Sequence, residues 1–199
     1  MARDAQATQA KLLQAARSYF AAHGFERSTV RAIAAEAGVN VALISRYFGS
    51  KEELFAQAVA IDLALPDLAG TPHKEIGPRL VEHFFRRWEG KPADDLLQVL
   101  IRTAATHPAA AAKIRTILAQ QIEPAVMAFT QSEHAGPRAA LIATQILGLA
   151  YCRYVLELSE RDLPRALAVR AIGETLGRYL TLDLTRDAMP PGIGQAAAL

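Results

Sequence analysis

Apolar residues recur at intervals of three and four along most of this chain, and no stretch alternates with the period of two that is typical of a strand. The pattern predicts an all-α protein of about nine helices joined by short loops that contain glycine or proline. In the second half, the expected helices cover residues 78–88, 94–106, 108–129 with a break at 123–124, 137–158 and 164–182. Residues 186–199, rich in Gly, Pro and Ala, are expected to form a disordered tail.

Residues 28–55 carry the most specific pattern, which predicts two short helices around a glycine turn and the start of a third. The apolar face of the first short helix consists of Val30, Ile33, Ala34 and Ala37. Gly38 supplies the left-handed conformation that ends this helix, and Asn40 is placed to cap a second helix over residues 41–48. Ile44 and Phe48 would point inward. The outward residues Val41, Ala42, Ser45 and Arg46 form the face that a helix-turn-helix inserts into the major groove of DNA.

The segments on either side of this motif strengthen the prediction, because a short helix pair with a glycine also occurs in proteins that only pack helices. Residues 11–23 form an amphipathic helix before the motif. After it, Ser50 and Glu53 make a capping box that begins a linking helix over residues 51–64. Lys51 lies in the first turn of that helix, beside exposed amide groups, which is a favourable position for a phosphate.

Residues 8–59 resemble the DNA-binding domain of TetR-type transcriptional regulators, with order and spacing kept without a gap. The matching residues are Ala15, Ala16, Phe20, His23, Gly24, Phe25, Thr29, Val30, Arg31, Ile33, Ala34, Ala37, Gly38, Val39, Ile44, Tyr47, Phe48, Ser50, Lys51, Glu52, Glu53, Leu54 and Phe55. The resemblance implies a DNA-binding domain over residues 1–50, the linking helix, and a ligand-binding and dimerisation domain over residues 65–185. It also implies a repressor that binds a palindromic operator as a homodimer and is released by a small-molecule inducer.

The same resemblance assigns contacts with double-stranded DNA to individual residues of this chain. Thr29, Tyr47 and Lys51 match positions that contact the phosphate backbone. Arg31 and Arg46 are long enough to reach either a phosphate or a guanine. The alternative for Arg46 is a solvated surface charge without a DNA contact.

The recognition helix also departs from the family pattern. Family members usually carry a tyrosine where this chain has Ser45 and a small polar residue where it has Leu43, so two phosphate anchors are missing. Val41 and Ala42 offer only methyl groups, which suit contact with the methyl group of thymine. The complete expected DNA-binding set is Thr29, Arg31, Asn40, Val41, Ala42, Ser45, Arg46, Tyr47 and Lys51.

The helix expected over residues 137–158 is apolar nearly all round, so it must be buried on two sides. One side would face its own domain, and the other would face a partner subunit together with the last helix. Gly148 would allow the two backbones to approach closely. The expected dimer interface is Leu141, Gln145, Gly148, Leu149, Cys152, Leu156, Ile172, Leu176 and Tyr179. The alternative is a central helix in a monomeric bundle.

The helices of the C-terminal domain carry more aromatic surface than a small core needs, and with the family resemblance this favours a ligand cavity. Its expected lining is Phe84, Phe85, Trp88, Leu100, Thr103, His107, Met127, Tyr151 and Tyr154. Thr103, His107 or Tyr151 would orient the ligand by hydrogen bonds. Because no patch of like charge occurs among these residues, the inducer should be largely apolar and neutral or weakly charged. The alternative is that the aromatic residues simply fill the core.

Charge and candidate chemistry add limits to this picture. The formal net charge is +2, and the first 55 residues carry seven basic against five acidic residues, so the whole excess lies there. Such a weak bias favours a small, defined set of phosphate contacts over nonspecific coating of nucleic acid. The five histidines are scattered, and the single cysteine, Cys152, allows no internal disulfide. We therefore expect no enzymatic activity, no metal site and no cofactor.

The sequence contains no apolar run long enough to span a bilayer, and its first residues are too polar for a secretory signal. A cytoplasmic protein without a membrane partner is expected. A second class of function remains open: a helical ligand-binding or adaptor protein that does not bind specific DNA. A mobility shift with the protein's own upstream DNA would separate the two classes.

Overall fold

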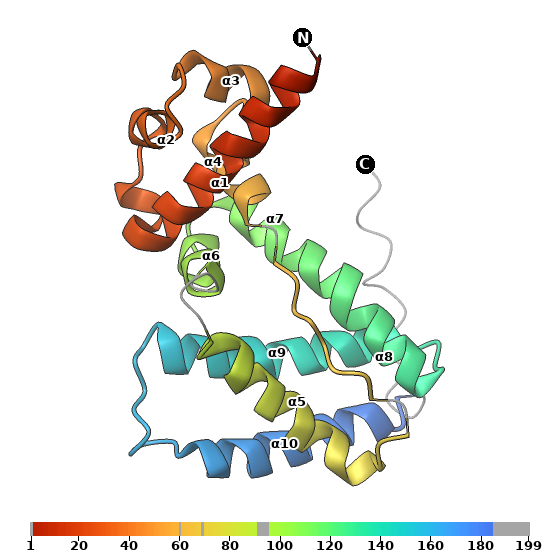
Figure 1. Cartoon of the computed structure of the whole chain (residues 1–199). Coiled ribbons are helices and arrows are strands. Elements are labelled where there is room, and N and C mark those ends of the chain that lie inside the picture. Colours follow the sequence, from red (N-terminus) through yellow and green to blue (C-terminus); the bar gives the residue numbers. More distant parts are fainter. Residues whose placement is uncertain (1, 60, 69, 91–95, 185–199) are drawn as a thin grey trace.

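The computed structural model describes residues 2–59, 61–68, 70–90 and 96–184, and within them the chain forms ten α-helices, one π-helical turn and no strand. The all-α prediction is confirmed. The N-terminal helices form one end of the molecule and the C-terminal helices form the other (Figure 1). The expected disordered tail over residues 186–199 lies outside the described residues.

The N-terminal end consists of α1 (Ala2–Arg27), α2 (Val30–Glu36), α3 (Ala42–Phe48) and α4 (Lys51–Ala58). α1 begins earlier than residue 11, and Gly24 interrupts its last turns with φ 72°. This break turns Phe25 back into the core, where its ring centre lies 5.1 Å from that of Phe55. Phe20 lies 5.0 Å from the same Phe55 ring, edge to face. These rings hold α1 against α4 and leave α3 on the outside.

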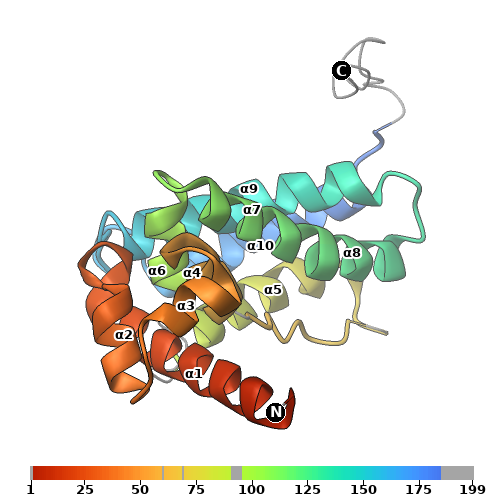
Figure 2. The same ribbon diagram turned by 90° about the horizontal axis from the view of Figure 1, so that it is seen from above.

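The C-terminal end consists of α5 (His73–Trp88), α6 (Leu96–Ala104), α7 (Pro108–Ile117), a π-helical turn (Leu118–Ile122), α8 (Glu123–Thr130), α9 (Ala135–Tyr154) and α10 (Arg165–Thr181). The break expected at Glu123-Pro124 is this π-helical turn, whose wider hydrogen-bonding pattern precedes a proline that has no N–H to donate. α9 packs against α8 and the π-helical turn (Figure 2).

α5 and α10 cross at two glycines, which decides where both helices lie. A Cβ atom added to Gly77 would lie 1.8 Å from the carbonyl oxygen of Gly173, so neither helix can carry a side chain at the crossing. The sequence places Pro78 in the first turn, and this expectation is wrong. α5 begins at His73 and contains Pro78 inside it, where one helical hydrogen bond is lost and the ring packs on Gly173.

Two arginines of α9 hold the ends of α10. The buried Arg138 donates to the carbonyl oxygens of Tyr179 (2.6 Å) and Leu182 (2.7 Å), so its positive charge lies at the negative end of the α10 dipole. Arg153 donates to the carbonyl oxygen of Leu163 at 2.7 Å, just before α10 begins. It also donates to the carbonyl oxygen of Leu158, which lies in a turn after α9 has ended at Tyr154 rather than at residue 158 as expected.

The linking helix is shorter than the sequence predicts. α4 ends at Ala58, and residues 61–68, which we call the linker, run in an extended conformation toward α5 (Figure 1). Gln121 of the π-helical turn accepts a hydrogen bond from the Leu63 amide at 2.7 Å and donates to the Ile61 carbonyl oxygen at 2.8 Å. Side-chain partners therefore replace the main-chain partners that a helix would supply. Ala64 adopts φ 47°, a strained conformation for a residue with a Cβ atom, which costs about 1–3 kcal/mol.

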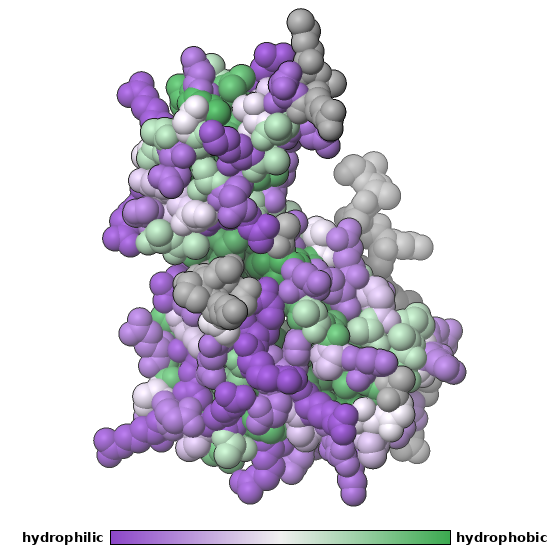
Figure 3. All heavy atoms as spheres, viewed as in Figure 1, coloured by the Kyte–Doolittle hydropathy of each residue, from purple (hydrophilic) through white to green (hydrophobic). Residues whose placement is uncertain are grey.

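Apolar residues gather at the surface in the waist between the N-terminal helices and the C-terminal domain, while hydrophilic residues cover most of the lower half (Figure 3). α6 and the start of α7 pack at this waist, where Leu96, Leu97 and Leu100 join the N-terminal core. Among the described residues, no helix is both long and apolar enough to cross a membrane.

The glycine crossing generates a stability prediction. Gly173→Ala would place a methyl group 2.7 Å from the Pro78 nitrogen, so the helices must separate, and we expect a loss of about 1–3 kcal/mol or more in the free energy of unfolding. Gly177→Ala, one turn later on α10, meets its nearest atom at 4.0 Å and should be neutral or stabilising by up to about 1 kcal/mol. Thermal unfolding of both variants checks this. Equal stability of the two would contradict the close crossing.

Candidate functional sites

The helix-turn-helix is held by the local interactions that the sequence predicts. The Thr29 hydroxyl accepts a hydrogen bond from the Ala32 amide at 3.1 Å and caps α2. Gly38 has φ 62° and redirects the chain. The Asn40 side chain then accepts from the Ala42 amide at 2.9 Å and begins α3. These contacts span two or three residues and fix where α2 and α3 begin, while Ile33 and Ile44 pack both helices into the core shared with α1 and α4.

α3 presents one face to the core and the other to solvent. Ile44 and Phe48 are buried beneath it, as expected. Its outward face carries Val41, Ala42, Ser45 and Arg46, all exposed, and Thr29, Arg31 and Asn40 are exposed around it. Tyr47 is half-buried at the edge of this face, and the Arg46 guanidinium lies 6.0 Å from the centre of its ring. α3 is therefore a short helix with a mixed apolar and polar face that is exposed to solvent.

Lys51 lies at the start of α4, where the Ser50 hydroxyl caps the helix by accepting from the Glu53 amide at 3.1 Å. The Lys51 ammonium is turned back toward α1: it lies 3.5 Å from the Glu26 carbonyl oxygen and 4.2 Å from the centre of the Phe25 ring. A contact between Lys51 and a phosphate thus requires this side chain to swing away from α1.

The structure divides the residues expected at the dimer interface into two groups. Leu149 and Leu176 are buried inside the C-terminal core. The expectation that these two residues lie in the dimer interface is therefore wrong. They pack inward because α9 and α10 share this core with α5. The others remain partly or fully exposed in the single chain: Leu141, Gln145, Gly148, Cys152, Leu156, Ile172 and Tyr179. A Cβ atom added to Gly148 would meet no neighbouring atom within 4 Å, so the face around it is open.

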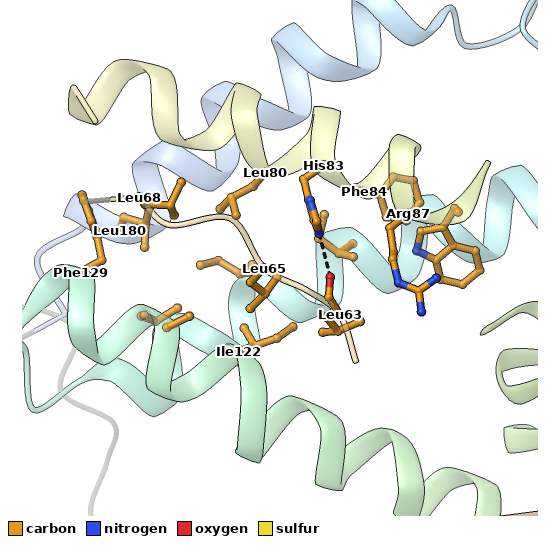
Figure 4. A pocket seen from close by; sticks show the side chains of 15 residues that line it. Leu63, Leu65, Leu68, Leu80, His83, Phe84, Arg87, Ile122, Phe129 and Leu180 are labelled. Atoms are coloured by element: carbon orange, nitrogen blue, oxygen red, sulfur yellow. Dashed lines mark hydrogen bonds between the residues drawn. The ribbon is translucent and has the colours of Figure 1, made fainter. Parts of the chain in front are cut away.

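A cavity lies between α5, α8, α9 and the linker (Figure 4). Its volume is about 90 Å³, and almost all of its surface is apolar. The lining residues are Leu63, Leu65, Leu68, Leu80, His83, Phe84, Arg87, Trp88, Ile122, Ala125, Val126, Phe129, Ile142, Ile146 and Leu180. Phe84 and Trp88 are therefore in the cavity wall, as the sequence predicts.

The polar groups of the cavity face the linker. The Nε2 atom of His83 lies 2.8 Å from the Leu63 carbonyl oxygen and donates to it, since a carbonyl oxygen can only accept (Figure 4). One helical turn further along α5, the Nε atom of Arg87 donates to the Asp62 carbonyl oxygen at 3.1 Å. Two donors of α5 are thus directed at two successive carbonyl groups.

The remaining residues expected in the cavity do not line it. Leu100 and Thr103 lie in the junction with the N-terminal end, because α6 packs on α1 rather than on α5. The His107 ring packs edge to face on Phe25 at 4.3 Å in the same junction. Met127 and Tyr151 are 43% and 41% exposed, so they belong to the outer surface.

Phe85 and Tyr154 are close to the cavity but behind its wall. Phe85 is fully buried on another side of α5, beneath the guanidinium of Arg165. The Tyr154 ring stacks on Trp88, with 5.0 Å between centres. Burial raises the pKa of the Tyr154 phenol above its ordinary value, and the neighbouring Glu89 carboxylate raises it further. The phenol therefore stays protonated at neutral pH. Its ring packs on the side of Trp88 that faces away from the cavity.

The cavity lining expected from the sequence omits His83, Arg87 and the linker leucines, which form part of the wall. Leu80, His83, Phe84 and Arg87 share one face of α5 at helical spacing, so a polar pair on the aromatic face is a usable signal. The linker offers no such signal, because its sequence favours a helix. In the part of the chain that the structure describes, no three His, Cys, Asp or Glu side chains come together in a way that could hold a metal ion.

Two family descriptions match this chain. Residues 12–58 match that of the bacterial regulatory proteins of the tetR family, and residues 74–180 match that of the tetracyclin repressor-like C-terminal domain. The second match alone spans more than half of the sequence. It covers α5 to α10 almost completely. Together the two matches cover the N-terminal and the C-terminal helices of the molecule.

Individual proteins are similar in sequence or in fold. The HTH-type transcriptional repressor SCO4008 of Streptomyces coelicolor is 45% identical over 67 residues, which span 32% of this chain and only 35% of that repressor. A transcriptional regulator of Rhodococcus sp. Rha1 has TM-score 0.56 at 22% identity, covering 92% of this chain and 99% of that one. NalD of Pseudomonas aeruginosa, the secondary repressor of the MexAB-OprM multidrug efflux pump, has TM-score 0.60 at 15% identity, covering 88% and 97%.

Proposed function

Because the chain belongs to the TetR family of bacterial transcriptional regulators, we propose that it is a repressor that binds a palindromic operator as a homodimer and leaves it when a small inducer binds. The family consists in general of non-enzymatic DNA-binding proteins. The observation that carries the proposal is the capped α3 helix, whose exposed face holds Val41, Ala42, Ser45 and Arg46 above a buried Ile44. A helix in this arrangement can enter a major groove, and of the proposed phosphate contacts Lys51 has to turn its side chain away from α1.

The charge distribution supports sequence-specific rather than general binding. The small basic excess of the chain lies in its first 55 residues. Thr29, Tyr47 and Lys51 would hold phosphates on either side of the groove, and Arg46 would contact a base edge. Arg31 and Asn40 complete the proposed contact set at the start of α2 and α3.

The outer face of α9 supports the homodimer. Gly148 and Tyr151 lie one turn apart on that face and are exposed, and Leu156 beyond them is 63% exposed. A second copy packed on this face would cover apolar surface that a monomer leaves in water. It would also place two α3 helices on one DNA duplex, as a palindrome requires.

The cavity between α5, α8 and α9 supports a small, largely apolar inducer. Its wall is built from aliphatic and aromatic side chains, with His83 and Arg87 as the polar groups described above. A molecule bound there can act on DNA only by favouring one arrangement of the two DNA-binding ends over another.

The first test of this proposal is a random-sequence selection with the full chain. An inverted repeat should be recovered, and Arg46→Ala should relax the preference at one position of each half-site, at a cost of about 1–3 kcal/mol. Lys51→Ala should instead weaken binding to all sequences alike and lower the salt dependence by about one phosphate contact. Recovery of no inverted repeat would sink the proposal and leave the adaptor function that the sequence also allows.

A second test addresses the homodimer. Gly148→Arg places a long charged side chain on the open face of α9, so sizing chromatography should show monomers. Operator affinity should fall by about 100-fold or more, because one half-site is lost. Ala112→Arg, on an exposed position of α7, is the matched control and should remain dimeric. A dimeric Gly148→Arg variant would place the interface elsewhere.

A further inference from the structure

The linker lies where a ligand would have to bind. Leu63, Leu65 and Leu68 all form part of the cavity wall. With these side chains in place the cavity measures about 90 Å³, whereas pockets that hold drug-sized ligands measure roughly 300–1,000 Å³. A ligand of that size is larger than the space left beside the linker, so part of the cavity wall has to move before it can bind.

The linker also makes the kind of contacts that a ligand would make. Its leucine side chains supply apolar contact with α5, α8 and α9. Its carbonyl oxygens at Asp62 and Leu63 accept hydrogen bonds from Arg87 and His83, the two donors directed at this end of the cavity. The wall and these two donors together suit an apolar body next to a pair of oxygen acceptors.

We propose that the linker is an internal occupant of the ligand cavity, and that the inducer is a largely apolar molecule with a carboxylate at one end that displaces it. A carboxylate presents two acceptor oxygens in the place of the two carbonyl groups and adds the attraction of a negative charge for the Arg87 guanidinium. The sequence predicts a largely apolar inducer that is neutral or weakly charged, and the proposal assigns it a single negative charge at one end. The inference rests on the proposed function, whose ligand site it specifies.

Displacement of the linker would affect the DNA-binding end directly, because the linker follows α4 in the chain. Ile61, its first residue, is buried in the N-terminal core beside Val59. Once released from Gln121, the chain after α4 can continue the helix that its sequence favours, and the strained φ of Ala64 is relieved. Pro66 would end that helix. The linker thus has two conformations, one extended in the cavity wall and one helical after α4. The inducer favours the helical conformation, because it takes the place of the extended one in the cavity.

The experiment uses the full chain without DNA. Trp88, the only tryptophan of the sequence, lines the cavity, so its fluorescence reports on binding of a probe. The probe is decanoate. Gln121→Ala removes both hydrogen bonds that hold Ile61 and Leu63 without removing a residue of the cavity wall. It should bind decanoate about tenfold more tightly than the natural sequence, because displacement becomes easier.

Two variants serve as controls for this titration. Gln120→Ala, the exposed neighbour on the same π-helical turn, should bind decanoate as the natural sequence does. Gln121→Met keeps the bulk of the side chain while losing its polar atoms, and it should bind as tightly as Gln121→Ala even if the alanine variant folds poorly. If neither Gln121 variant binds more tightly than Gln120→Ala, the linker is not an occupant that the ligand displaces.

The assignment of a carboxylate head group is tested by comparing the affinities of the protein for decanoate and for decyltrimethylammonium. The second probe also has a ten-carbon chain but carries a positive head group. The natural sequence should prefer decanoate by at least about tenfold, and Arg87→Met should abolish this preference. Equal affinity of the natural sequence for the two probes would overturn the assignment of the head group. None of these results depends on DNA, so they remain separate from the operator selection, whose failure would count against the proposed function alone.

Discussion

The hydrogen bonds between Gln121 and the main chain of the linker are the constraint on which the arrangement of this molecule depends. Peptide groups beside an apolar cavity must find partners, because leaving one unpaired costs about 1–3 kcal/mol. Gln121 pairs with the amide of Leu63 and the carbonyl oxygen of Ile61, and His83 and Arg87 pair with the next two carbonyl oxygens. These partners set the path of the linker after α4 and hold it in the cavity wall.

The DNA-binding end could be predicted almost completely from the sequence, because short-range interactions determine it. Thr29, Asn40 and Ser50 each cap a helix through an amide two or three residues away. Gly38 needs a positive φ wherever the rest of the chain lies. The exposed and buried faces of α3 then follow from helical periodicity alone.

The linker and the cavity could not be predicted in the same way. The sequence after α4 favours a helix, and it is overruled by Gln121, 58 positions beyond Leu63 in the chain. The packing of α6 on α1 likewise moves Leu100 and His107 from the expected cavity into the junction between the two ends. Phe84 and Trp88 are predictable as cavity residues because they lie on one face of a single helix. The interaction of the linker with distant segments leaves no periodic signal in the sequence of the linker itself.

In the proposed mechanism the state of the linker controls the DNA-binding end. This control is tested most directly by the affinity of Gln121→Ala for the selected operator, measured in the absence of any inducer and beside Gln120→Ala. Release of the linker by mutation should imitate the inducer, so Gln121→Ala should bind the operator about tenfold more weakly while Gln120→Ala binds it normally. Unchanged operator affinity in Gln121→Ala would contradict the coupling between cavity and α3.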